Sequence, residues 1–204
     1  MHPSVLIING SHREEGVTDA VVGAMKEVLA AEGIDATEIV LRRSEIAFCG
    51  NCRHCTQEPG ELPGKCEIND VMTCQILQQL EAADGYIFLS PTTFGTVTSY
   101  FKRFLERLTV YGYWPWETPA PEFRKPERKA ALCFSCCAAP SLMGRVMFSS
   151  ISLLKKAARC VGAKTVDTLL IGLVAGEAHP TLSERDWRRI EKSTRKLVVA
   201  LKHP

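Results

Sequence analysis

Apolar residues along the chain fall into two alternating patterns, short apolar runs and longer stretches with helical spacing. The short runs are typical of strands buried on both faces of a parallel sheet, and the strands they predict are 5–8, 35–41 (apolar at 39–41), 86–89, 129–134 and 165–171. Between and after them, apolar positions recur every three or four residues, which predicts helices at 18–31, 71–83, 98–108, 145–161 and 183–202. Strands that alternate with helices form a parallel sheet covered on both faces. We therefore expect a single α/β domain over residues 1–204, built on a five-stranded parallel sheet.

Three of the predicted strands run directly into loops rich in Gly, Ser, Thr or Pro, at 10–18, 90–96 and 135–141. Ligands of open α/β sheets bind beyond the carboxyl ends of the strands, where the strand order reverses. Because these carboxyl ends share one edge of the sheet, we expect the three loops to surround one ligand.

The first of these loops, residues 10–18, has the features of a phosphate site, and we call it the phosphate loop. A buried strand turns at Gly10, and a helix capped by Thr18 or Asp19 would present unpaired N–H groups to an anion. Ser11 and Thr18 add hydroxyl donors, and Arg13 adds a positive charge. Ordinary strand–helix connections look similar, but three anion-binding side chains within eight positions favour phosphate.

Two common phosphate loops do not match this segment. The dinucleotide fingerprint needs G-x-G-x-x-G and a later acidic residue, whereas five residues separate Gly10 from Gly16 and the next strand ends in Arg42 and Arg43. The nucleoside-triphosphate loop needs G-x-x-x-x-G-K-[ST], whereas Val17 follows Gly16 here. A loop that holds one terminal phosphate fits better, which indicates a mononucleotide such as FMN.

Composition limits the remaining possibilities. The chain has 204 residues, of which 46% are apolar and 24% charged, as in soluble globular proteins. No segment approaches the roughly 18 apolar residues of a membrane helix, and no basic stretch precedes the first apolar run, so we expect a cytoplasmic protein without a membrane partner. A net charge of +2 does not favour nucleic acid. Nine cysteines, an odd number, argue against a disulfide framework and for metal or redox chemistry.

Four of these cysteines lie in one stretch, residues 42–69, which lacks lasting periodicity and which we call the cysteine loop. Cys49, Cys52 and Cys55 are spaced C-x2-C-x2-C, and Cys66 follows after ten further residues. Such gaps allow the thiolates to converge on a [4Fe–4S] cluster. Zinc is an alternative, held by the four thiolates or with His54 replacing one of them. Unligated or redox-active thiols are the third possibility.

The chain resembles the flavodoxin-like flavoproteins of the NADPH-dependent FMN reductase group, and in particular the branch of the iron–sulfur flavoproteins. The resemblance covers residues 4–108 and rests on five blocks, namely G-S-H-R-E-E-G-V-T at 10–18, C-G-N-C-R-H-C at 49–55, G-K-C-E-I-N-D-V-M at 64–72, A-D-G-Y-I-F-L-S-P-T-T-F-G at 83–95 and F-K-R-F-L-E-R at 101–107. It implies a flavodoxin-like three-layer sandwich that binds FMN.

The resemblance also implies roles for particular residues. The FMN phosphate would lie in the phosphate loop, on Ser11, Arg13, Gly16, Val17 and Thr18, although the family usually has asparagine at the position of Val17. The segment 91–95, which we call the ring loop, would pass along the flavin ring, with Pro91, Thr92, Thr93, Phe94 and Gly95. Phe94 would either stack on the ring or bury itself. Ser135 and Cys136 would face the ring from the other side, and Cys49, Cys52, Cys55 and Cys66 would hold the cluster near the flavin.

These features predict an FMN-dependent oxidoreductase. It would take electrons from NAD(P)H or an iron–sulfur cluster and pass them to a small acceptor, namely a quinone, a metal ion, oxygen or a redox carrier protein. No catalytic acid or base is identified. The alternatives are a flavodoxin-type electron carrier and a metal-binding protein that kept the fold.

A second long loop, 109–127, carries Tyr111, Tyr113, Trp114 and Trp116. Aromatic residues with polar groups suit interfaces, so we expect a homodimer or homotetramer in which this loop forms the subunit contact. A lid over the flavin is the alternative role.

Overall fold

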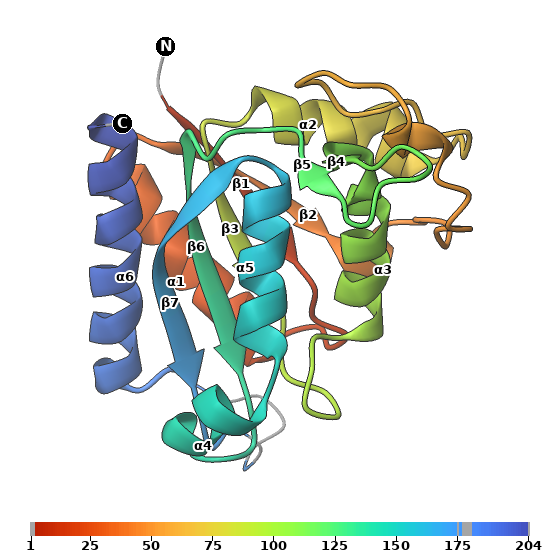
Figure 1. The fold of residues 1–204 in the computed structure, drawn as a ribbon. Coiled ribbons are helices and arrows are strands. Elements are labelled where there is room, and N and C mark those ends of the chain that lie inside the picture. Colours follow the sequence, from red (N-terminus) through yellow and green to blue (C-terminus); the bar gives the residue numbers. More distant parts are fainter. Residues whose placement is uncertain (1–2, 175, 177–180, 204) are drawn as a thin grey trace.

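The computed structural model describes residues 3–174, 176 and 181–203. Its centre is a five-stranded sheet in the order β2-β1-β3-β6-β7 (Figure 1). The strands are β1 (Ser4–Asn9), β2 (Asp35–Val40), β3 (Gly85–Leu89), β6 (Lys129–Cys136) and β7 (Ala163–Ile171). Every neighbouring pair is parallel, which confirms the predicted sheet.

Helices cover both faces of this sheet (Figure 1). The helices α1 (Val17–Ala31) and α6 (Glu184–Lys202) pack on one face, and η3 (Met72–Ile76), α2 (Leu77–Ala82), α3 (Ser99–Arg107) and α5 (Ser150–Cys160) pack on the other. Strand β1 shows why its sequence is continuously apolar. Val5 and Ile7 enter the core under α1, whereas Leu6 and Ile8 enter the opposite core. The three-layer, flavodoxin-like sandwich predicted from the sequence is therefore confirmed.

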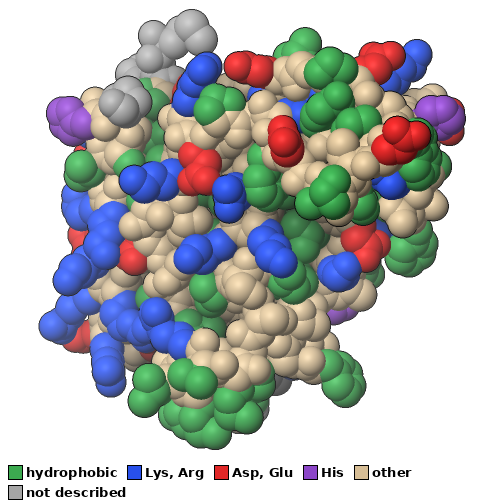
Figure 2. All heavy atoms as spheres, viewed as in Figure 1, with side chains coloured by type: hydrophobic (Ala, Val, Ile, Leu, Met, Phe, Trp, Pro, Cys, Tyr) green, Lys and Arg blue, Asp and Glu red, His purple; other side chains and the backbone are tan. Residues whose placement is uncertain are grey.

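The segment predicted as one helix at 145–161 is two helices. Helix α4 spans Ser141–Met147, and α5 begins at Ser150. Between them Phe148 adopts an extended backbone, and the N–H of Ser149 donates to the carbonyl of Gly95 at 2.9 Å instead of continuing the helix. The outer side of α4 leaves apolar side chains exposed, visible as a group at the lower end of the molecule in Figure 2, and its members are Leu142, Met143, Val146 and Met147.

The two long loops contain little regular structure, as predicted. The cysteine loop includes only the short turns η1 (Leu41–Arg43) and η2 (His54–Thr56). The loop at 109–127 follows the turn η4 (Leu108–Tyr111) and contains a small antiparallel pair that the sequence did not predict, formed by β4 (Gly112–Tyr113) and β5 (Glu122–Phe123). Among the helices that the structure describes, none combines the length and the apolar character needed to cross a membrane.

The aromatic residues of the 109–127 loop contact other parts of the same chain. Tyr111 is fully buried and donates a hydrogen bond to Glu81 at 2.7 Å, and Trp114 and Trp116 pack on the guanidinium of Arg53. The homodimer or homotetramer expected from these residues remains a prediction. Because the residues pack within the chain, their aromatic character no longer argues for a subunit contact.

Gly10 marks the point where β1 must pass close to α3. A Cβ atom on Gly10 would lie 2.9 Å from the Phe101 side chain and 3.0 Å from the carbonyl oxygen of Leu89. We expect Gly10→Ala to lower the free energy of unfolding by about 1–3 kcal/mol, because the core is overpacked. Gly23→Ala is the matched control, since nothing lies within 4 Å of its Cβ position inside α1, and it should raise stability by about 0.5–1 kcal/mol. Urea unfolding measures both, and equal stability of the two variants would contradict the close approach.

Candidate functional site

The strand order brings the three ligand-facing loops together. From β1 the chain moves outward to β2 and then returns to the other side of β1 to form β3, so the order reverses between β1 and β3. This reversal is where flavodoxin-like sheets bind their ligand. The loops after β1, β3 and β6 leave this edge of three adjacent strands, at the lower end of the sheet in Figure 1.

Buried hydrogen bonds join the phosphate loop to β3 and α3. The N–H of Gly10 donates to the carbonyl of Leu89 at 2.8 Å. The hydroxyl of Thr98 donates to the carbonyl of Gly10 at 2.6 Å and also accepts the N–H of Phe101, which caps α3. Thr98 was missed as a site residue, although a threonine directly before an apolar helix is a recognisable capping signal.

Helix α1 begins one residue earlier than predicted, at Val17. Its N-cap is Gly16, and no side chain caps it, so the prediction that Thr18 or Asp19 caps the helix is wrong. The first amides of any helix lack an intrahelical partner, and those of α1 also have no capping side chain. An anion can therefore bind to them. Gly16 lies against Arg13, because a Cβ there would be 3.1 Å from the Arg13 side chain.

The side chains predicted to bind phosphate differ in how they are placed. Thr18 and Ser11 are buried, whereas Arg13 is exposed. The hydroxyl of Ser11 accepts the N–H of Arg13 at 3.2 Å and donates to the carbonyl of Arg13 at 3.1 Å, so it shapes the loop. Val17 is partly exposed at the first helical position, where it offers a backbone amide but no polar side chain.

An acidic residue, Asp19, lies in the first turn of α1, where Arg42 balances its negative charge. Its carboxylate accepts hydrogen bonds from the side chain of Asn9 at 2.7 Å and from Arg42 at 3.0 Å. Asn9 is fully buried, and its other side-chain atom accepts the N–H of Ser11 at 2.9 Å. Asn9 was also missed, and its signal in the sequence is a polar residue that ends a continuous apolar run.

The ring loop and the end of β6 meet at Thr92. The N–H of Thr92 donates to the carbonyl of Cys136 at 2.7 Å, and its hydroxyl lies 3.1 Å from that of Ser135 and 2.8 Å from that of Ser150. Ser135 and Cys136 belong to β6 itself and are buried, so they line the floor of the site and do not face the solvent. The Cys136 thiol lies 3.8 Å from the Thr18 hydroxyl, and burial raises its pKa to about 11, which keeps it protonated.

Phe94 stands at the tip of the ring loop. Its φ is 49° and that of Gly95 is 75°, and the backbones of Thr93 and Thr96 pair across this tight turn. A positive φ is unusual for a bulky residue. The Phe94 side chain is fully exposed, so the alternative that it buries itself is wrong. Pro91 is partly exposed beside it.

In the cysteine loop, Cys55 and Cys66 pack against the same part of the core, Cys49 is half-buried and Cys52 is exposed. Burial is the largest cause that raises the pKa of the Cys55 thiol to about 11, and the neighbouring thiols contribute to the same rise. Cys49 accepts the N–H of Asn51 at 3.4 Å. Because the loop has so little regular structure, side-chain contacts must hold its backbone in place.

Two arginines fix the backbone of this loop. Arg53 is stacked between two rings, 3.8 Å from the centre of Trp114 and 4.2 Å from that of Trp116, and it donates to the carbonyl of Trp114 at 2.7 Å. Arg124 donates to the carbonyls of Cys55 at 3.0 Å and Gly60 at 3.2 Å. The arm that carries Cys66 is thereby held against Cys55. A cavity of about 730 Å³ opens beside this arm, lined among others by His54, Glu58, Glu61, Lys65, Glu67 and Arg124.

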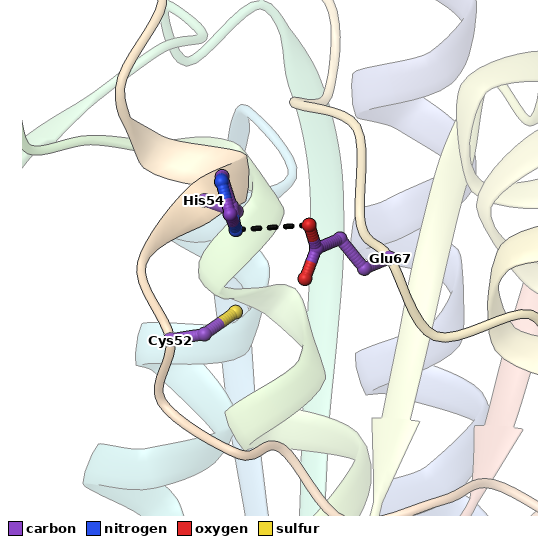
Figure 3. A group of neighbouring side chains, drawn as sticks. All are labelled: Cys52, His54 and Glu67. Atoms are coloured by element: carbon purple, nitrogen blue, oxygen red, sulfur yellow. Dashed lines mark ion pairs between the residues drawn. The ribbon is translucent and has the colours of Figure 1, made fainter.

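Three exposed side chains of this loop form a small cluster of potential ligands (Figure 3). Nδ1 of His54 lies 3.0 Å from Oε1 of Glu67, and Cys52 completes a group whose ligand atoms are all within 4.8 Å of one another. Among the described residues, it is the one group of three or more such ligands packed this closely. The four thiols of the described chain do not form such a close group by themselves.

The two candidate sites lie at opposite ends of α3. Thr98, before its first residue, contacts Gly10 of the phosphate loop, and Arg107, its last residue, contacts Cys66. A nine-residue helix is about 13 Å long. Cys66 is therefore about one helix length from Gly10, although the start of the cysteine loop touches the phosphate loop, where Arg43 pairs with Glu14 at 2.8 Å.

Comparisons with known proteins identify the family and the fold. The sequence profile of the NADPH-dependent FMN reductase family matches residues 3–170. The chain belongs to this family of FMN-dependent oxidoreductases. Its fold is similar to that of the NAD(P)H:quinone oxidoreductase of Methanothermobacter marburgensis, with a TM-score of 0.69 and 19% identity over 97% of this chain and 100% of that one. It is also similar to an archaeal flavodoxin, with a TM-score of 0.58 and 11% identity over 98% and 99% of the two chains.

Curated relatives of this family member are iron–sulfur flavoproteins. That of Methanocaldococcus jannaschii is 37% identical over 103 residues, which are 50% of each chain. That of Methanosarcina thermophila is 28% identical over 100 residues, which are 49% of each chain. The chain thus spans about half the length of the curated relatives that it matches.

Gly64 is the tightest backbone contact in the cysteine loop. A Cβ atom there would lie 1.7 Å from the carbonyl oxygen of Cys55, and the N–H of Gly64 donates to Val110 at 2.8 Å. We expect Gly64→Ala to push the arm away from Cys55 and to speed amide hydrogen exchange across residues 54–66. Gly50→Ala, in the same loop with nothing within 4 Å of its Cβ position, is the control and should exchange like the parent chain. Equal protection in both variants would show that the arm does not rest on Cys55.

Proposed function

We propose that this protein is an FMN-dependent oxidoreductase of one domain, residues 1–204. The observation that carries the proposal is the uncapped start of α1 at the β1/β3 reversal, where free amides, the buried Thr18 hydroxyl and the exposed Arg13 gather. These groups fit one terminal phosphate. The phosphate of FMN would lie on residues Ser11, Arg13, Gly16, Val17 and Thr18, with Val17 contributing its backbone.

The flavin ring would lie against the ring loop. Pro91, Thr92, Thr93 and Gly95 supply a stiff turn with backbone donors and acceptors, and Phe94 offers an exposed aromatic face. Ser135 and Cys136 would support the ring from β6 through their backbone, because their side chains are buried. When bound, FMN supplies hydride and electron transfer, and the chain's own residues bind it, orient it and limit access of water. The buried Cys136 thiol stays protonated and provides no nucleophile.

We also propose that Cys49, Cys52, Cys55 and Cys66 hold a [4Fe–4S] cluster. The C-x2-C-x2-C spacing supports it, and so does the packing of Cys66 and Cys55 against the same part of the core. N–H donors to the sulfurs of Cys49 and Cys66 are also typical of such sites, where they help to set the reduction potential. Electrons would enter from NAD(P)H or a redox carrier protein and leave to a small acceptor such as a quinone.

The phosphate site is tested by Thr18→Val, which removes the buried hydroxyl but keeps the shape of the side chain. A hydrogen bond to a charged group contributes about 1.5–3 kcal/mol, so the Kd for FMN should rise by about 10- to 150-fold. Quenching of flavin fluorescence measures this, and Thr165→Val in β7 serves as a control that should bind like the parent chain. Unchanged FMN binding in the Thr18 variant would show that Thr18 is not part of the phosphate site.

The metal site is tested by Cys52→Ser with Cys74→Ser as its matched control. Both cysteines are exposed, but Cys74 lies on η3, outside the set of four. Anaerobically reconstituted parent protein should contain about four irons per chain and absorb broadly near 400 nm. The Cys52 variant should lose the iron and keep FMN, and the Cys74 variant should keep both. Iron retained equally in the two variants would refute the assignment.

A further inference from the structure

Arg107 is buried at the centre of the contacts that hold the cysteine loop. Its side chain is only 1% exposed. Nη1 donates to Oδ2 of Asp70 at 2.6 Å and Nη2 donates to Oδ1 at 3.1 Å, which makes a two-pronged ion pair. Nη1 also donates to the carbonyl of Ala47 at 3.0 Å. One side chain therefore joins the segment before Cys49 to the residue that follows the loop.

The same guanidinium also points at a predicted metal ligand. Nη2 lies 3.6 Å from Sγ of Cys66, within the range of a hydrogen bond to sulfur. Burial acts to lower the pKa of Arg107, but the hydrogen bonds and charge of Asp70 outweigh it and raise the pKa, so the group stays charged. Burial likewise acts to raise the pKa of Asp70, and its hydrogen bonds from Arg107 and from the N–H groups of Ala47 and Thr73 lower it below its ordinary value.

The bonds to Asp70 and Ala47 hold the loop together, but they do not explain why the guanidinium also reaches the sulfur of Cys66. A buried ion pair contributes little net stability compared with apolar residues of the same volume, and α3 already packs through Phe101 and Phe104. What an apolar residue would not supply is a fixed positive charge and an N–H group at the sulfur of Cys66. Both stabilise negative charge on that sulfur and on a metal centre bound to it.

We infer that Arg107 is the positioning residue of the cysteine site, which holds Cys66 in place and raises the reduction potential of the metal centre there. This inference rests on the proposed cluster. Reduction adds one electron, supplied by an external reductant such as dithionite, and makes the centre more negative by one charge without making or breaking a bond. A buried guanidinium favours the more negative state, and the carboxylate of Asp70 disfavours it.

The two members of the pair therefore predict shifts of opposite sign. Arg107→Gln removes the positive charge and should move the midpoint potential to a more negative value. Asp70→Asn removes the negative charge and keeps one of the two oxygen acceptors that bind the N–H groups of Ala47 and Thr73, so it should move the potential to a more positive value. Arg107→Lys keeps the charge without the two-pronged geometry, and its shift should be smaller than that of Arg107→Gln.

Redox titration of the anaerobically reconstituted full-length chain, followed by electron paramagnetic resonance, measures these potentials. Iron content is determined for each variant. Arg188→Gln is the control, because Arg188 is exposed on α6, on the opposite face of the sheet, and pairs with Glu184. Its potential should match that of the parent chain.

Opposite shifts in the Arg107→Gln and Asp70→Asn variants would support the inference, whereas equal potentials, or shifts of the same sign, would overturn it. If Arg107→Gln does not hold iron, Asp70→Asn decides the matter alone, since a positive shift supports the inference and any other result overturns it. A parent chain that binds no iron would instead refute the proposed cluster, and this inference with it.

Discussion

Both candidate sites depend on how helix α3 is held at its two ends. At its start, the buried hydroxyl of Thr98 bonds to the carbonyl of Gly10, where β1 turns into the phosphate loop. At its end, the buried guanidinium of Arg107 bonds to Asp70, Ala47 and Cys66. Between these points Phe101 and Phe104 anchor the helix in the core. The helix thus sets the distance between Gly10 and Cys66, because a packed helix cannot be stretched or shortened.

Each site also contains an acidic residue that would repel its proposed ligand, and each acid is compensated by an arginine. Asp19 lies in the first turn of α1, and Arg42, at the end of β2, pairs with it at 3.0 Å. Asp70 lies beside the cysteine site, and Arg107 pairs with it at 2.6 Å. In both places the acid fixes backbone N–H groups, namely those of Glu15 for Asp19 and of Ala47 and Thr73 for Asp70. The acids order the loops, and the arginines offset their charge.

The features that the sequence predicted well are those encoded locally. Continuous apolar runs such as 5–8 are typical of buried strands, and the chain order of strands and helices leaves few parallel topologies. The capping of α1 was mispredicted because Thr18 and Asp19 are both good caps, whereas the helix begins at Val17 after Gly16, which has no side chain to cap it. The break before Ser149 depends on a hydrogen bond to Gly95, more than fifty residues away, which no local pattern records.

The candidate sites were likewise predictable only where their residues lie close together in the sequence. The spacing of the four cysteines and the hydroxyls of the phosphate loop could be recognised from the sequence. The residues that arrange them could not, because Arg107 and Arg124 come from distant segments and look like ordinary surface charges in sequence.

The central claim is that one chain holds a flavin at the start of α1 and an iron centre among the four cysteines. A crystal structure of anaerobically purified protein, with anomalous data collected on both sides of the iron absorption edge, tests this most directly. The account predicts iron density enclosed by Cys49, Cys52, Cys55 and Cys66, and the FMN phosphate beside Thr18. Density without an iron signal among these thiols, or a flavin phosphate bound elsewhere, would contradict it.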